Sequence, residues 1–164
     1  MQVFRGIPAR ASHSTVLTIG NFDGVHRGHR AMLAKLTGLA KQAGLPSAVM
    51  TFEPNPREFF APQSAPARLA SLREKLQLLA ECGVDQAYVC AFNARFAALT
   101  AEAFVERIVN GLGVRHLMIG DGEGPLEIAA AEVQQREFLA RIGIGRIDAD
   151  GFVESALCLI RAVH

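Results

Sequence analysis

Residues 20–29 constrain the fold of this 164-residue chain more than any other stretch, and they read Gly-Asn-Phe-Asp-Gly-Val-His-Arg-Gly-His. An apolar run, Val16–Ile19, precedes them, and an amphipathic segment, Ala31–Ala43, follows. This order predicts a strand, a tight turn and a helix, an arrangement that can cradle a phosphate. Glycine lets backbone approach a ligand closely, and the turn has three: Gly20, Gly24 and Gly28.

Two histidines, His26 and His29, stand at the predicted start of the helix. Their i, i+3 spacing places both rings on one face. The first N–H groups of a helix have no partner within it, and the helix dipole adds partial positive charge there. The pair therefore indicates an anion site, with a nucleotide phosphate expected and neutral imidazoles as donors. Two other readings are surface or capping residues, and a zinc pair, for which no third ligand stands at a suggestive spacing.

Apolar runs alternate with amphipathic segments, which predicts an α/β fold of the Rossmann-like, doubly wound type. The sheet would be mostly parallel with helices on both faces, and ligands bind at the carboxyl edge of such sheets. The expected strands are Val16–Ile19, Ala48–Phe52, Ala87–Ala91, Leu117–Ile119 and Ile142–Ile147. The expected helices are Gly28–Ala43, Leu72–Cys82, Ala101–Leu112, Leu126–Ile142 and Val153–Val163.

Local patterns mark two of the helix starts and one long loop. Ser71 with Glu74 makes a capping box, and Thr100 is the expected N-cap of the following helix. Segment 53–68 contains four prolines and a Phe-Phe pair. A connection of this length with its own aromatic residues is more often functional than filler.

Composition narrows the class of protein. Half of the residues are hydrophobic and the net charge is only +1. We therefore expect one folded domain over residues 1–164, with neither nucleic acid nor a membrane as partner. The three cysteines, Cys82, Cys90 and Cys158, show no CxxC spacing and sit among apolar neighbours. They are expected to be buried free thiols, and with no signal-peptide pattern at the N-terminus they indicate the cytoplasm.

The glycine-rich turn also carries a family resemblance. Its HxGH pattern, residues 26–29, resembles the first signature of HIGH-type nucleotidyltransferases. The fuller pattern GxFDGxHxGH resembles the FMN adenylyltransferase domain of bacterial bifunctional riboflavin kinase/FAD synthetases. The resemblance covers about residues 2–121 and includes stretches 51–60, 68–75, 92–100 and 117–121. It implies an enzyme that transfers AMP from ATP to FMN, giving FAD and pyrophosphate. Mg²⁺ would arrive with ATP, through protein ligands that the sequence does not identify.

The resemblance also assigns roles to individual residues. Phosphate charge would be stabilised by His26, His29 and Arg161. ATP would be bound by Gly20, Asn21, Phe22, Asp23, Gly24, Gly28, Gly120 and Asp121. FMN would be bound by Phe52, Pro54, Asn55, Pro56, Arg57 and Phe59, with Arg57 on its phosphate and Phe59 or Phe60 on its ring.

The residues alone leave several of these roles open. Asp23 is a turn residue, a nucleotide contact or a metal ligand, and Phe22 is a core residue or a wall of the nucleotide cleft. The proline-rich segment is a flavin-binding loop, or else a rigid surface loop whose aromatic side chains turn into the core. A transferase with a different phosphorylated acceptor is a further reading, which stretches 52–60 and 68–75 disfavour.

Beyond Asp121 the chain departs from the family pattern. The expected aromatic residues are absent after Gly120-Asp121. Leu157 and Cys158 stand where an ISSTxxR-like motif would place phosphate-binding hydroxyls, so Arg161 is either an ATP contact or an ordinary helix charge. No riboflavin kinase motif is found, and a single activity is expected. The alternative is a catalytically impaired paralogue that binds nucleotide or flavin. The sequence leaves the oligomeric state open.

Overall fold

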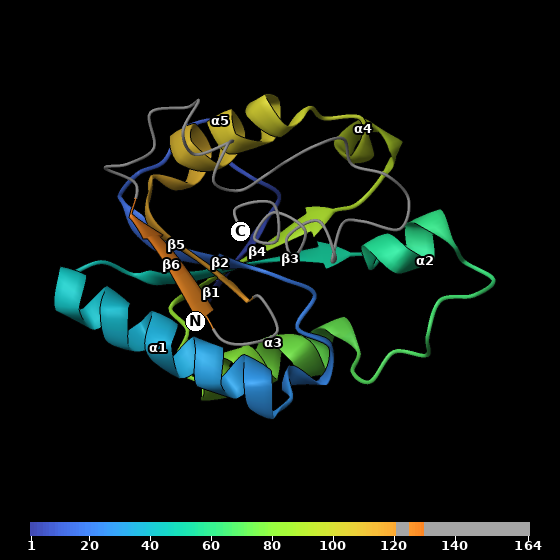
Figure 1. Cartoon of the computed structure of the whole chain (residues 1–164), viewed down its shortest axis with the longest axis horizontal. Helices are drawn as coiled ribbons and strands as arrows, with labels where there is room; N and C mark the ends of the chain where they lie inside the picture. The colour runs from blue at the N-terminus through green and yellow to red at the C-terminus, as the bar shows by residue number, and fades with distance from the viewer. Residues whose placement is uncertain (121–124, 130–164) are drawn as a thin grey trace, which may run out of the picture.

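A mostly parallel sheet forms the centre of the computed structural model, which describes residues 1–120 and 125–129 (Figure 1). Within these residues the strand order is β1-β4-β3-β2-β5-β6. Strands β1 to β5 run parallel, whereas β6 is antiparallel to β5. The predicted α/β fold with a mostly parallel sheet is confirmed. The strands are β1 Gln2–Arg5, β2 Thr15–Ile19, β3 Ser47–Glu53, β4 Gln86–Ala91, β5 Val114–Gly120 and β6 Pro125–Ala129.

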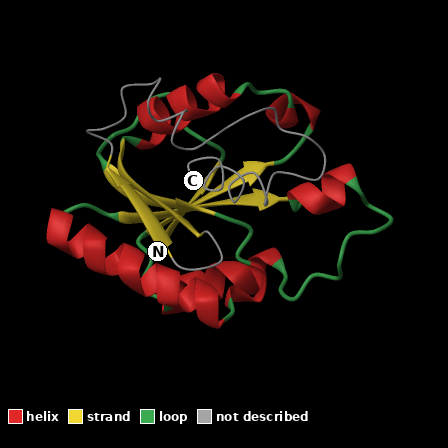
Figure 2. Cartoon of the chain, in the orientation of Figure 1, coloured by secondary structure: helices red, strands yellow, loops and turns green. Residues whose placement is uncertain are grey.

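Helices cover both faces of this sheet (Figure 2). Helices α1 and α3 lie on one face, and α4 and α5 lie on the other, while α2 follows directly from the end of β3 (Figure 1). This is the doubly wound arrangement that the sequence predicts. The helices are η1 Asp23–Val25, α1 Arg27–Ala43, α2 Pro56–Phe60, α3 Leu72–Glu81, α4 Ala94–Ala97 and α5 Ala101–Leu112.

Two hydrophobic cores hold the layers together, one on each face of the sheet. Successive strand residues point to opposite faces, so Val16 packs under α1 whereas Leu17 packs under α5. On the first face Leu33 and Leu36 of α1 meet the strands, and on the second face Ile108 belongs to the core that α5 forms with the strands. Six consecutive residues of β3 are buried, as expected for a central parallel strand covered on both sides.

The predicted helix starts are confirmed. The Ser71 hydroxyl accepts a hydrogen bond from the Glu74 N–H, and the Glu74 carboxylate accepts one from the Ser71 N–H, which completes a capping box for α3. The Thr100 hydroxyl likewise accepts from the Ala103 N–H at the start of α5. These caps fix the residue at which each helix begins, near the carboxyl edge of the sheet.

Several expectations need correction or lie outside the described residues. A helix over Leu126–Ile142 is wrong at its start, because Pro125–Ala129 forms β6 and pairs with the open edge of β5. The short elements β1, α2 and α4 were not predicted, because so few residues carry too little periodicity. Cys90 is buried and Cys82 half-buried, both as free thiols. The expected elements Ile142–Ile147 and Val153–Val163, together with Cys158, Asp121 and Arg161, lie outside the described residues.

Candidate functional site

The candidate site lies where the chain reverses its direction of travel across the sheet. From β2 the chain builds β3 and then β4 on one side, and it then crosses to place β5 on the other side of β2. The carboxyl ends of β2 and β5 therefore lie side by side at the switch point of the sheet, the usual ligand position in such sheets. Gly20 follows β2 and Gly120 ends β5, so the structure brings these two predicted residues to one edge.

Residues 20–26, here called the signature turn, follow β2 in a constrained backbone conformation. Phe22 and Val25 both have positive φ, 50° and 38°, which is uncommon for residues with a side chain. The Phe22 side chain is fully buried in the α1-side core and Val25 is almost fully buried beside it. The structure thus places Phe22 in the core. The burial of its side chain holds the backbone of the turn in its strained conformation.

Asp23 joins the signature turn to the residues that precede α3. Its carboxylate accepts hydrogen bonds of 3.0 Å from the backbone N–H groups of Leu69 and Ala70. The Leu69 side chain also covers Gly24, where an added Cβ would approach Leu69 Cβ to 3.1 Å. Sequence reasoning treated Asp23 as a turn residue or nucleotide contact and missed this link, because its partners lie 46 and 47 residues away.

The two histidines meet at the first turn of α1. His26 is the N-cap, and its Nδ1 accepts a 3.4 Å hydrogen bond from the His29 N–H. The two rings stack with their centroids 3.7 Å apart, and the His29 ring also lies 5.0 Å from that of Phe22. The capping reading is therefore confirmed for His26. His29 Nδ1 is buried and has no hydrogen-bond partner among the described residues.

Burial keeps His29 neutral. Desolvation is the largest cause that lowers its pKa, from 6.5 to about 4, and the nearby His26 lowers it further. Lys75 acts in the same direction, whereas the Asp23 carboxylate opposes the shift. A neutral imidazole has one N–H donor and one acceptor nitrogen. His29 can therefore donate a hydrogen bond to an anion at neutral pH without itself carrying charge.

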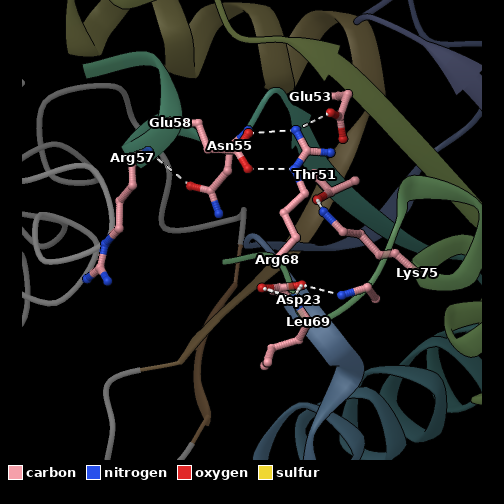
Figure 3. A network of polar contacts seen from close by, with 10 residues as sticks. Asp23, Thr51, Glu53, Asn55, Arg57, Glu58, Arg68, Leu69 and Lys75 are labelled. Atoms are coloured by element: carbon pink, nitrogen blue, oxygen red, sulfur yellow. Dashed lines mark hydrogen bonds and ion pairs between the residues drawn. The ribbon is translucent and has the colours of Figure 1, made fainter. Parts of the chain in front are cut away.

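A polar network extends from the signature turn to the end of β3 (Figure 3). The Lys75 ammonium, on a residue only 6% exposed, donates a 3.5 Å hydrogen bond to the Thr51 hydroxyl. Thr51 in turn donates to the Asn21 carbonyl at 3.2 Å. Burial lowers the pKa of Lys75, while the Glu53 and Asp23 carboxylates counteract that shift. Lys75 ends the stretch 68–75 that carries the family resemblance, but no role was predicted for it, because its buried contacts are with residues far away in sequence.

The predicted flavin residues form a continuous segment, and their environments differ. Phe52 and Pro56 are buried, and Asn55 caps α2 through a capping box with Glu58. Pro54, which follows a cis peptide bond, and Arg57 are exposed. In Figure 3 the Arg57 side chain points away from the polar network.

Aromatic rings surround this segment. Phe59, 37% exposed, packs edge-on against Phe60 and Phe92. Phe92 and Phe96 continue the contacts to Phe52 in the core. The reading in which the aromatic side chains turn into the core therefore holds for Phe52, whereas Phe59 keeps a partly open face. Sequence reasoning did not propose Phe92 or Phe96 for this site, although both lie in a stretch that carries the family pattern.

In the described part of the chain, no group of three or more His, Cys, Asp or Glu side chains is placed to hold a metal ion. No helix among the same residues is long and apolar enough to cross a membrane.

The sheet order, with a histidine-lined helix start at its switch point, is typical of α/β proteins that bind nucleotides. Comparison with known proteins makes this specific. A family model described as FAD synthetase matches residues 9–123. The chain therefore belongs to the FAD synthetase family.

Curated relatives agree with this assignment. A bifunctional riboflavin kinase/FMN adenylyltransferase from Pseudomonas fluorescens is 48% identical over 149 residues, covering 89% of this chain and 47% of the relative. Its counterpart from Escherichia coli K12 is 52% identical over 125 residues, covering 74% of this chain and 40% of the relative. The chain thus spans less than half the length of either relative.

One solved structure resembles the fold. It is titled as a macrolide-efflux protein from Streptococcus pneumoniae and superposes with a TM-score of 0.58 at 23% identity. The match covers 71% of this chain and 40% of that one. At this identity the likeness supports the fold alone.

Proposed function

We propose that this chain is an FMN adenylyltransferase, which transfers AMP from ATP to FMN to give FAD and pyrophosphate. The observation that carries the proposal is the buried, unpartnered Nδ1 of His29, beside the N-terminus of α1 in a chain of the FAD synthetase family. An anion that binds at this helix start would give that nitrogen a partner and neutralise partial positive charge.

In this reaction the attacking group needs little activation. An oxygen of the FMN phosphate, already anionic, attacks the α-phosphorus of ATP, and the bond to the pyrophosphate leaving group breaks. The protein therefore contributes alignment and stabilisation of phosphate charge. We assign that work to His29 and His26 together with the first N–H groups of α1. The glycines of the signature turn would let the nucleotide approach the backbone closely.

Mg²⁺ would enter with the triphosphate. Because Mg²⁺ commonly takes one or two carboxylates and fills its other positions with phosphate oxygens and water, it needs no cluster of protein ligands. The ion would supply charge neutralisation on the leaving pyrophosphate.

The flavin would lie toward β3 and β4. Residues 53–60, here called the flavin loop, end in α2 with the partly exposed Phe59. We propose that the flavin ring packs on Phe59 and that Arg57, whose side chain is exposed and directed away from the protein network, reaches the FMN phosphate. The free thiols Cys82 and Cys90 suit the reducing cytoplasm in which we place this reaction.

The test is FAD formation by the purified chain from FMN, ATP and Mg²⁺. Replacement His29→Ala should lower the rate by on the order of 10²–10³-fold, the usual effect of losing one preorganised donor. Lys41→Ala, an exposed change at the opposite end of α1, is the matched control and should keep the wild-type rate. If the wild-type chain binds ATP and FMN yet forms no FAD, the impaired-paralogue reading replaces this proposal. A chain that ignores flavin while using ATP would have another acceptor.

A further inference from the structure

The flavin loop contains little structure that could hold its own shape. Its helix, α2, has only five residues, and an isolated helix of that length is unstable in water. The residues that follow, 61–69, are almost all exposed. Contacts beyond the loop must therefore fix where Phe59 and Arg57 lie, and the packing of Phe59 against Phe92 is one of them.

Arg68 adds polar contacts that tie the loop to the sheet (Figure 3). Its Nε donates to Glu58 Oε1 at 2.5 Å and its Nη2 donates to Glu58 Oε2 at 2.6 Å. The same Nη2 lies 2.7 Å from Glu53 Oε1. One guanidinium thus binds Glu53 at the end of β3 and Glu58 in the middle of α2. Its contact with Glu58 is bidentate, a geometry that requires the planar, forked guanidinium.

The residues next to Arg68 hold the other half of the site. Leu69 and Ala70 donate their backbone N–H groups to the Asp23 carboxylate in the signature turn. Three consecutive residues, 68–70, therefore contact both the flavin loop and the signature turn. Because residues 68–70 are consecutive, these contacts hold the flavin loop at a short distance from the signature turn.

We propose that Arg68 is a positioning residue for adenylyl transfer: it holds the flavin loop in the place from which FMN can meet ATP at the signature turn. The inference rests on the proposed function for its substrate. The Arg68 side chain is 42% exposed, so its ion pairs contribute little to global stability. Its effect is expected on the geometry of the reacting pair, which steady-state kinetics can resolve.

The first measurement compares kinetic constants of Arg68→Met with those of the wild type. The kcat/KM for FMN should fall by on the order of tenfold or more, because small displacements of a reacting group are costly. The Kd for ATP alone should stay within about twofold, since the histidines and the Asp23 contacts are untouched. A general structural defect would instead weaken both substrates alike, and that result, or an unchanged kcat/KM for FMN, would overturn the proposal.

Two further variants separate the fork from the charge. Arg68→Lys keeps the positive charge but cannot make the bidentate contact, so it should behave like Arg68→Met. Arg73→Met removes an equivalent exposed cation from the first turn of α3 and should match the wild type. Full activity in Arg68→Lys would show that charge alone suffices and would refute a positioning role.

Amide hydrogen exchange tests, without any flavin chemistry, whether the contacts of Arg68 with Glu53 and Glu58, here called the latch, hold the flavin loop in place. The α2 amides of Glu58, Phe59 and Ala61, which donate to backbone carbonyls within the loop, should exchange on the order of tenfold faster in both Arg68 variants. Arg73→Met should leave them unchanged. Unaltered α2 exchange in Arg68→Met refutes the latch even if FAD is made. If exchange is faster in the Arg68 variants but the wild-type chain makes no FAD, the structural role of the latch is supported and the proposed function is refuted.

Discussion

The neutrality of His29 is a property of its surroundings, and it has a cost that can be measured. The ring is desolvated between Phe22 and His26 and lies near the Lys75 ammonium. Each of these neighbours is in place before any ligand arrives. A donor that is already neutral and already oriented needs no rearrangement during the reaction, which is how preorganised sites gain their advantage.

This preorganisation predicts a specific dependence of stability on pH. In the folded chain the pKa of His29 is about 4, below its ordinary 6.5, so between these values the unfolded chain binds a proton that the folded chain does not. Stability should therefore fall as pH falls through this window. From about pH 7 to about pH 5 the wild type should lose roughly 1–2 kcal/mol more than His29→Gln.

Urea unfolding at the two pH values measures the difference directly. Other groups titrate in both proteins, and comparison with His29→Gln subtracts them. Equal losses in the two proteins would mean that His29 keeps an ordinary pKa in the folded state.

At the scale of elements, the sequence predicted those with enough periodicity to read. Helices α1, α3 and α5 carry apolar residues at helical spacing, and the capping residues Ser71 and Thr100 mark two of their starts. Helix α2 escaped prediction because its five residues, which begin with Pro56 and end in a Phe-Phe pair, carry too little periodicity. The segment that contains it was predicted to be functional, since long connections with their own aromatic side chains are more often functional than filler.

Asn55, a predicted flavin contact, also has a structural role in α2. Its side chain accepts from the Arg57 N–H, and the Glu58 carboxylate accepts from the Asn55 N–H. Replacement Asn55→Ala should destabilise α2 by about 1 kcal/mol, the usual value of an N-cap, whereas Asn55→Asp should keep the helix. Exchange rates of the α2 amides measure this. An Asn55→Asp variant that loses α2 as completely as Asn55→Ala would contradict the capping role.

At the scale of the whole molecule, the sequence predicted the sheet, its carboxyl edge as the ligand side and the histidines, but not the contacts that join them. Hydrophobic patterning and the glycine-rich turn are local, so they could be read directly. The Asp23 contacts with Leu69 and Ala70, and the path from Lys75 through Thr51 to Asn21, join residues far apart in sequence. No spacing rule reports such pairs, because only the folded topology brings β2, β3 and α3 to one edge.

The connection between β1 and β2 joins the edge strand β1 to the rest of the domain. It crosses the end of α5, where the Ala11 N–H donates to the Asn110 carbonyl and the Thr15 hydroxyl donates to the Leu112 carbonyl. These contacts satisfy carbonyls that a helix end would otherwise leave unpaired. The chain approaches so closely that a Cβ on Gly111 would overlap the Pro8 carbonyl oxygen and come within 2.5 Å of the Ile7 side chain.

The same substitution should therefore have opposite effects in two helices. Gly111→Ala should lower the free energy of unfolding by about 1–3 kcal/mol, because the added methyl forces the β1–β2 connection away from α5. Gly38→Ala, inside α1 with nothing within 4 Å of the new Cβ, should raise it by roughly 0.5–1 kcal/mol through better helix propensity. Denaturant unfolding of both variants gives the two signs. A Gly111→Ala protein as stable as Gly38→Ala would show that the connection does not rest on α5, and β1 would then be held to the sheet by its pairing with β4 alone.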